Sequence, residues 1–201
     1  MPRASIVLYF ELQPSASPAA VKKWIRYLES NIPGCNSVCR LVASDTTSDE
    51  KSYAKELLID VQDGDAITAE LVDSWRAVGA DVLKYSDWII YQEISRDYRK
   101  GLSADQYPPT NTELWFNEEH LDMLADVPGW RSGSRFQLLK RFGDNREHAS
   151  IFMSANEYDE ENGLGGPIWK KSIDTPWTKR VTENLYEPNH RRTWKYVQLD
   201  A

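Results

Sequence analysis

Residues 32–40 read Ile-Pro-Gly-Cys-Asn-Ser-Val-Cys-Arg, and residues 127–135 read Val-Pro-Gly-Trp-Arg-Ser-Gly-Ser-Arg. Pro, Gly, Ser and Arg recur in register, and each copy follows a helical pattern and precedes an apolar run. A repeat of about half the chain, present only twice, is too long and too rare for a solenoid. It predicts two copies of one α+β unit fused head to tail, residues 1–100 and 101–201.

The first half of the chain shows the pattern of a βαββαβ unit. Ser17 and Pro18 have the residue types of a helix N-cap and first turn. Apolar residues at helical spacing follow them, and the pattern stops before a Pro-Gly pair. The expected elements are strands at 6–12, 38–43, 53–61 and 87–94 and helices at 18–32 and 67–82. This order is the split βαβ arrangement of ferredoxin-like folds.

The second half repeats this order less clearly. Helices are expected at 112–126 and 167–185, and strands at 135–141, 149–158 and 193–199. The first strand of this half should fall near 96–103, where the sequence is a poor strand former. Either the long run 87–99 serves both halves, or one strand has degenerated. The predicted fold class is α+β: tandem ferredoxin-like βαββαβ units that form an intramolecular dimeric α/β barrel with its helices outside.

Composition limits the function classes. The 201 residues include 8 Trp and 10 Tyr, which favours an aromatic-rich core or an aromatic-lined pocket. A formal net charge of −7 argues against nucleic-acid and anionic-membrane partners. The apolar stretch 6–10 is too short for a signal peptide or a membrane span, so a cytoplasmic protein is expected. Cys35 and Cys39, if extended, lie roughly 13 Å apart, which predicts free thiols rather than a disulfide.

His120 is the candidate catalytic residue. In the helix expected at 112–126 it lies on the apolar stripe together with Phe116 and Met123, while acidic residues occupy the opposite side. Histidine titrates near neutral pH and is suited to proton transfer. The alternative is a structural histidine bonded to a backbone carbonyl or a tyrosine. The histidines lack the spacing of a metal site, so no metal and no cofactor are expected.

Strand alternation supplies candidate pocket walls. Tyr9 and Glu11 share one face of the first strand, and Phe152, Asn156 and Tyr158 share one face of the strand 149–158. The aliphatic face of this later strand is expected to pack under helices. The mixed aromatic and polar face would then line the interior, and these residues would bind substrate together with Phe116 and Met123.

Arg40 and Arg135 end the two repeat copies. Two roles are open for them. They can bind an anion, or each can pair with an acidic neighbour at the start of a strand. The structural role is favoured because both copies keep the arginine.

The second half resembles the fused, fungal type of dimeric α/β-barrel protein, akin to EthD-like and stress-responsive barrel proteins. Residues 115–121, Trp-Phe-Asn-Glu-Glu-His-Leu, are similar to the family pattern Trp-Tyr-Asp-Glu-Glu-His-Leu. Residues 127–130, 163–167 and 175–177 also fit, whereas Phe116 and Asn117 depart from the pattern. The resemblance covers residues 110–197 well and 1–95 in outline.

The resemblance implies a family of cofactor-free cyclases, isomerases and decarboxylases, some oxygenases and haem binders, and proteins without a known role. The first hypothesis is a cofactor-independent lyase, isomerase or cyclase that moves a proton on a small aromatic or polyketide-like metabolite, with His120 as general acid/base. The second is a non-catalytic metabolite-binding or stress-response protein, and the third is a haem-dependent enzyme. The expected partner is a small-molecule substrate, and the chain is a monomer or a homodimer.

Overall fold

The computed structural model describes residues 3–44, 55–98, 120–143, 151–176, 178–179 and 193–197. The chain is α+β, as expected. In chain order the elements of the described ranges are β1 (Ala4–Leu12), α1 (Pro18–Asn31), β2 (Cys35–Ala43), β3 (Lys55–Val61), α2 (Ala69–Val78), β4 (Leu83–Tyr98), α4 (His120–Ala125), β5 (Trp130–Gly143), β6 (Phe152–Tyr158), α5 (Pro167–Ile173) and β7 (Trp194–Val197).

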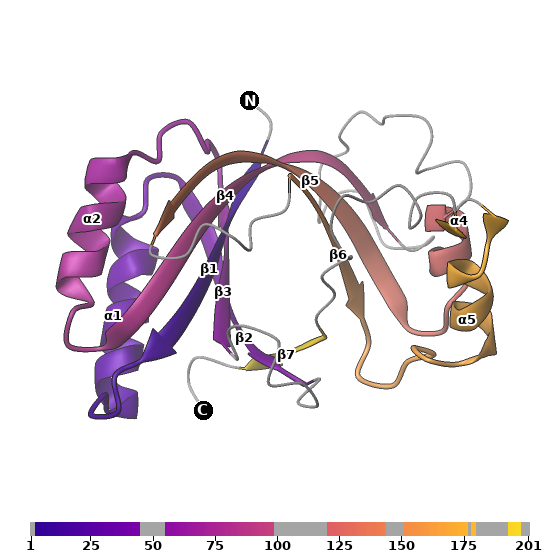
Figure 1. Cartoon of the computed structure of the whole chain (residues 1–201), viewed down its shortest axis with the longest axis horizontal. Coiled ribbons are helices and arrows are strands. Elements are labelled where there is room, and N and C mark those ends of the chain that lie inside the picture. Colours follow the sequence, from indigo (N-terminus) through magenta and orange to yellow (C-terminus); the bar gives the residue numbers. More distant parts are fainter. Residues whose placement is uncertain are drawn as a thin grey trace. The chain divides into compact units, whose positions relative to one another are not determined.

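The strands follow the order β6-β5-β4-β1-β3-β2-β7 in one sheet (Figure 1). Strand β1 is central and runs antiparallel to both β3 and β4. Strand β2 runs antiparallel to β3 and to the short strand β7. The last strand of the chain therefore pairs with a strand from its beginning.

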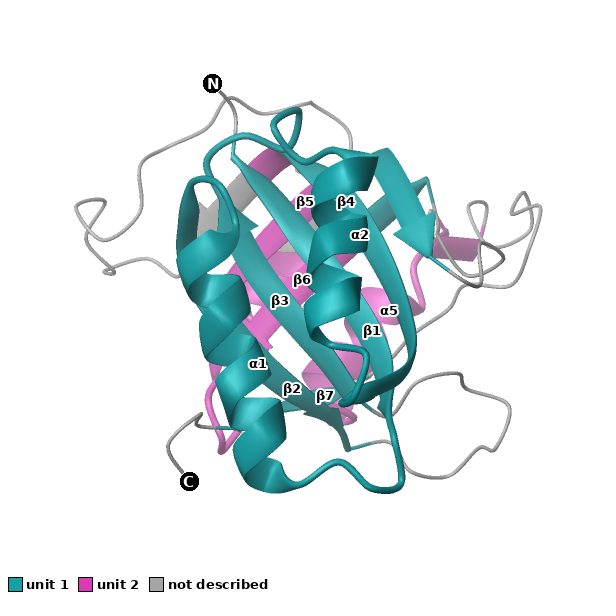
Figure 2. Ribbon diagram, turned by 90° about the vertical axis from the view of Figure 1, so that its left-hand side faces the viewer, with its two compact units in different colours: residues 1–93, 137–153, 192–201 teal, residues 94–136, 154–191 magenta. Residues whose placement is uncertain are grey.

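The chain divides into two compact units (Figure 2). Unit 1 comprises residues 1–93, 137–153 and 192–201, and unit 2 comprises residues 94–136 and 154–191. Strand β4 has 16 residues, of which 83–93 belong to unit 1 and 94–98 to unit 2. The strand is thus continuous across the boundary between the two units at residues 93 and 94.

Helix α1 forms where its end signals predict it. The Ser17 side chain accepts a hydrogen bond from the Ala20 N–H at 3.2 Å, and Pro18 occupies the first turn. The helix ends at Asn31, before Gly34 turns the chain with a φ of +64°. Its buried residues are the predicted apolar stripe: Val21, Trp24, Ile25 and Leu28.

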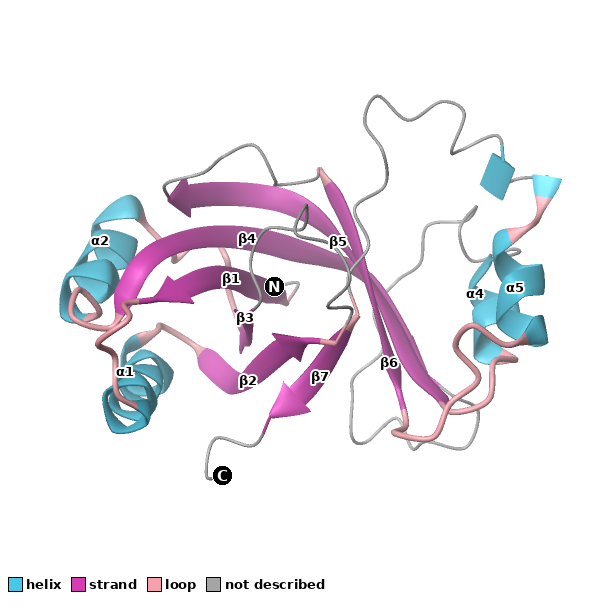
Figure 3. Ribbon diagram, turned by 60° about the horizontal axis from the view of Figure 1, so that its bottom comes forward, coloured by secondary structure: helices cyan, strands magenta, loops and turns pink. Residues whose placement is uncertain are grey.

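The main core of unit 1 lies between its strands and the helices α1 and α2, which cover the same face (Figures 2 and 3). Phe10 of β1 meets the Trp24 ring edge-on at 5.8 Å, and Trp75 of α2 packs on Trp88 of β4 at 5.5 Å. Gly79 ends α2, and a β-carbon there would lie 2.7 Å from the Trp24 indole nitrogen. The core therefore needs a glycine at this position.

Unit 2 contains the helices α4 and α5, which pack against each other. The turn before β5 is joined to the loop after β6 by two backbone hydrogen bonds. Asp159 N–H donates to the Gly129 carbonyl at 2.7 Å, and Gly163 N–H donates to the Pro128 carbonyl at 2.8 Å. Two segments that carry the family resemblance thus bind each other.

The prediction of a single helix over 167–185 is wrong. Helix α5 ends at Ile173, and Asp174 and Thr175 interrupt the helical conformation, which resumes at Pro176. Pro176 has no N–H to continue a helix, whereas the Thr175 hydroxyl accepts a hydrogen bond from Thr178 N–H at 3.1 Å. Thr175 therefore begins a new helical turn.

Candidate functional site

The predicted site residues fall into both units. Tyr9 and Glu11 on β1 and Phe152 at the start of β6 belong to unit 1. Met123 on α4 and Asn156 and Tyr158 on β6 belong to unit 2. Phe116 lies outside the described residues. His120 is the first residue of α4, and its side chain is also outside the described part.

The predicted residues of β6 differ in their surroundings. Phe152 is 58% exposed, and on the opposite face Ile151 is 64% exposed while Met153 and Ala155 are half-buried. The Asn156 carbonyl oxygen accepts a hydrogen bond from the buried Trp130 indole at 3.3 Å. Asn156 therefore has a structural contact, and Tyr158 beside it is half-buried.

Glu11 forms an ion pair. Its Oε2 atom lies 3.2 Å from Lys84 Nζ, and both side chains are substantially exposed, at 44% and 59%. A pair this open to water contributes little to stability.

Tyr9 belongs to a face of unit 1 that points away from α1 and α2. Along β1, Ala4, Ile6, Leu8 and Phe10 enter the helix-covered core, so alternation directs the intervening residues to the other side. We call this side the second face. The register of the neighbouring strands places the following residues on it: Ser5, Val7, Tyr9 and Glu11 of β1, Ser37, Cys39 and Leu41 of β2, Glu56, Leu58 and Asp60 of β3, Asp87, Ile89 and Tyr91 of β4, and Trp194 and Tyr196 of β7.

One row across the second face brings ionisable groups together. Tyr9 lies directly opposite Glu56 of β3 on one side and Asp87 of β4 on the other. Directly opposed residues have β-carbons about 4.5–5.5 Å apart. Glu56 is only 5% exposed and Asp87 only 3%, although both are acidic. A half-buried phenol thus lies between two buried carboxyl side chains.

Tyr91 adds a second phenol on the same face, in the row that pairs it with Ser5. Burial, and to a smaller extent the negative charge of Glu56, raises the pKa of Tyr91 to about 12, and the positive charge of Arg141 partly opposes this shift. The Tyr91 hydroxyl therefore stays protonated at neutral pH and can donate a hydrogen bond.

An aromatic surface borders this row. The Trp194 ring stacks on the Tyr9 ring with centroids 6.2 Å apart and planes inclined by 29°. Strand β7 brings Trp194 there by pairing it with Ala43 of β2. Leu41, Leu58 and Trp194 are all half-buried. The second face consequently offers partly accessible apolar and aromatic surface beside buried acids, and a flat apolar molecule suits such a surface.

Sequence reasoning identified Tyr9 but missed Glu56, Asp87 and Tyr91. The sequence around Glu56 does show an alternating pattern, because Glu56 and Asp60 alternate with the apolar residues Leu57, Ile59 and Val61. This pattern usually indicates a solvent-exposed face, so it gave no reason to expect a buried glutamate.

Other features of the described residues do not coincide with this row. A surface hollow of about 480 Å³ is lined by residues between β1 and α1 and after α2, and one of about 220 Å³ adjoins the start of β4. No group of three or more His, Cys, Asp or Glu side chains in the described ranges is placed to hold a metal ion. Within the same ranges, no helix is both long and apolar enough to cross a membrane.

The sequence matches no protein-family model and no curated protein. Solved structures do match over nearly the whole chain. An anthrone oxidase-like protein has a TM-score of 0.50 and 12% identity, covering 98% of this chain and 92% of that one. A proposed chlorite dismutase has a TM-score of 0.56 and 12% identity, covering 99% and 96%. A proposed monooxygenase from Lactobacillus acidophilus has a TM-score of 0.43 and 12% identity, covering 98% and 93%.

The two structures with TM-scores of 0.50 and 0.56 share the fold of this chain. At 12% identity the likeness shows a shared fold and no shared activity. The expected resemblance is thereby supported for the fold alone.

Proposed function

We propose that the protein is a cofactor-independent enzyme, a lyase, isomerase or cyclase, that transfers a proton on a small aromatic or polyketide-like metabolite. The observation that carries the proposal is the position of Tyr9, between the buried Glu56 and Asp87 and against the Trp194 ring. Proton transfer at carbon needs a positioned base, a donor for the developing oxyanion and a dry surface that orients the substrate.

The second face has a residue for each of these tasks. Glu56 or Asp87, buried beside the phenol, is the proposed base that takes a proton from a carbon next to a carbonyl group. Tyr91 keeps its proton and is the proposed donor to the enolate oxygen that forms. Tyr9 and Trp194 supply the aromatic surface on which a flat ring system would stack.

His120 also belongs to the proposal as a general acid/base, because an imidazole exchanges protons readily near neutral pH. It begins α4 in unit 2, whereas the acidic row lies in unit 1. Separate substitutions of Glu56 and His120 will assign the base.

The fold comparisons support the substrate class in one respect. Anthrone, for which one similar structure is named, is a flat aromatic ketone with an enolisable ring carbon. Chlorite, for which another is named, is a small inorganic ion. The fold alone does not choose between such chemistries, so the residues of the second face carry the argument.

The finer architecture is part of the same proposal. Two βαββαβ units, residues 1–100 and 101–201, would form an intramolecular barrel in a chain of the fungal type that is cytoplasmic and acts as a monomer or homodimer. Strand β4 is continuous from Leu83 to Tyr98, which supports the alternative in which one long run serves both halves.

The alternative is a metabolite-binding or stress-response protein without catalysis. The Tyr9–Trp194 stack and its half-buried apolar neighbours favour it as well, because they suit binding whether or not chemistry follows. The two functions differ in whether the protein labilises a carbon-bound proton.

Hydrogen–deuterium exchange separates them. Anthrone is incubated with the protein in D₂O, and loss of its ring CH₂ signal is followed by proton NMR against buffer alone. Catalysed exchange is expected, and Glu56→Gln should slow it by about 10²-fold if Glu56 is the base. His120→Ala tests the imidazole in the same way. Glu29→Gln, an exposed glutamate of α1, is the control and should leave exchange unchanged.

Three outcomes are informative. Exchange that persists in both Glu56→Gln and Asp87→Asn rules out the acidic row as the base. Binding of anthrone without exchange above the buffer rate supports the non-catalytic alternative. Neither binding nor exchange with this and related enolisable aromatic ketones contradicts the proposed substrate class.

A further inference from the structure

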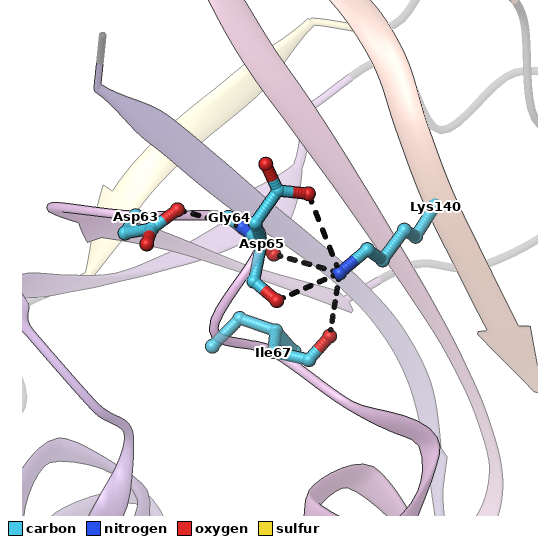
Figure 4. A network of polar contacts seen from close by, with 5 residues as sticks. All are labelled: Asp63, Gly64, Asp65, Ile67 and Lys140. Atoms are coloured by element: carbon cyan, nitrogen blue, oxygen red, sulfur yellow. Dashed lines mark hydrogen bonds and ion pairs between the residues drawn. The ribbon is translucent and has the colours of Figure 1, made fainter. Parts of the chain in front are cut away.

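The ammonium group of Lys140, on β5, is surrounded by oxygen atoms of the loop between β3 and α2 (Figure 4). Its Nζ atom lies 2.8 Å from the Asp65 carbonyl oxygen, 3.2 Å from the Ile67 carbonyl oxygen and 3.5 Å from the Gly64 carbonyl oxygen. The Asp65 carboxylate is 3.6 Å away. Three main-chain carbonyls and one carboxylate therefore converge on a single positive charge.

This ligand set is the kind that hard metal cations prefer. Carbonyl and carboxylate oxygens bind such ions, and a ring of carbonyl dipoles replaces the hydration shell of a monovalent cation. Carbonyl oxygens that point at one another repel unless a positive charge lies between them. Only one of the four contacts involves a formal charge, and that Asp65 side chain is 75% exposed. The carbonyls consequently provide most of the attraction.

Packing holds the loop in this form. A β-carbon on Gly64 would lie 2.9 Å from the Ala4 and Leu139 side chains and 3.0 Å from Ile90, so only glycine permits this approach to the core. On its other side, the Asp63 carboxylate accepts a hydrogen bond from Asp65 N–H at 2.8 Å. The loop is thus shaped independently of the lysine, which means that its carbonyls would still converge without it.

The N-terminus of α2 disfavours a cation in this loop. The helix begins at Ala69 with Thr68 as its N-cap, and a helix N-terminus carries a partial positive charge. The favourable oxygen contacts must therefore outweigh this repulsion. A neutral side chain would avoid this repulsion.

We propose that the loop from Asp63 to Ile67 is a monovalent-cation site in which the Lys140 ammonium group takes the place of the metal ion. Removal of the lysine side chain opens the site to K⁺ or Na⁺. The proposal is independent of the function argued for the second face.

The test compares thermal unfolding of the full chain in KCl, NaCl and choline chloride at equal ionic strength. Choline is too large to enter the loop and serves as the inert cation. Lys140→Ala removes both the charge and the side chain, and it should lower the Tm by about 4–8 °C in choline chloride. KCl or NaCl should restore most of that loss. The wild type and Lys140→Arg should not distinguish among the three salts.

Lys140→Met is the matched control. It keeps a long side chain in the space but carries no charge, so it should be destabilised and should gain nothing from K⁺ or Na⁺. A Lys140→Ala protein with the same Tm in all three salts overturns the proposal, as does one that folds in none of them. An equal response of the Met variant overturns it too, because the salt effect would then be general.

Discussion

Replacing Tyr91 by Phe isolates the electrostatics of the second face. The Tyr91 side chain is 3% exposed, and burial and the Glu56 charge raise its pKa from 10.0 to about 12. The folded state therefore holds the phenolic proton after the unfolded chain has released it. The stabilisation is fully present below pH 10 and is lost as the pH rises toward 12, amounting to about 3 kcal/mol in total.

The assay is urea unfolding of the wild type and Tyr91→Phe in steps from below pH 10 to pH 11. The lysines and the remaining tyrosines titrate in both proteins, so their effects cancel in the difference between the two unfolding free energies. The wild type should lose about 1 kcal/mol more than Tyr91→Phe by pH 11. Parallel loss of stability in the two proteins would refute a raised Tyr91 pKa and with it the role of Tyr91 as a protonated donor.

Two further variants test the causes of the shift. Glu56→Gln removes a negative charge and should lower the pKa of Tyr91, while burial continues to hold it above the usual value. Arg141→Met removes the opposing positive charge and should raise that pKa. Ultraviolet absorption of tyrosinate, read as the difference from Tyr91→Phe, follows the titration. A pKa that moves in the same direction in both variants would contradict this arrangement of charges.

Two predictions concern the local structure. Gly129→Ala should destabilise by about 2 kcal/mol or more, because φ is +80° and a β-carbon would lie 2.7 Å from the Glu161 carbonyl oxygen. Gly165→Ala is its control: φ is +77° but no atom lies within 4 Å, so only the strain of about 1 kcal/mol is expected in urea unfolding. Equal losses of stability in Gly129→Ala and Gly165→Ala would contradict a cost from the contact with the Glu161 carbonyl. Ser17→Ala should cost about 1 kcal/mol through loss of the α1 cap, and an unchanged unfolding midpoint would contradict that role.

Local signals were sufficient for the first helix and insufficient for the last. Ser17-Pro18 starts α1 as predicted because a cap and its helix are neighbours in sequence. Thr175-Pro176 is a similar pair of a hydroxyl residue and a proline, yet one continuous helix was expected over 167–185. The proline at 176 and the hydrogen bond to the Thr175 hydroxyl decide the matter locally. The prediction of one helix therefore overlooked a helix-start signal of the same kind as that of α1.

The candidate site required information that no single strand contains. Tyr9 was found because its strand alternates, but its partners Glu56 and Asp87 come from two other strands. Their pairing depends on the register across the sheet. Their burial depends on what covers the second face, and a strand's own sequence reports only which residues share a face.

The burial of Glu56 and Asp87 distinguishes the second face from an ordinary solvent-exposed sheet surface. A carboxylate loses much solvation energy when it leaves water, so a chain keeps one there only with compensating charges or hydrogen bonds. Arg141 supplies a positive charge that acts on Tyr91. If the network is only structural, Glu56→Gln will change stability and leave deuterium exchange untouched. If Glu56 is the base, exchange will fall while the Gln variant stays folded, because the amide preserves the shape of the side chain. The two measurements on one variant therefore distinguish a structural acid from a catalytic one.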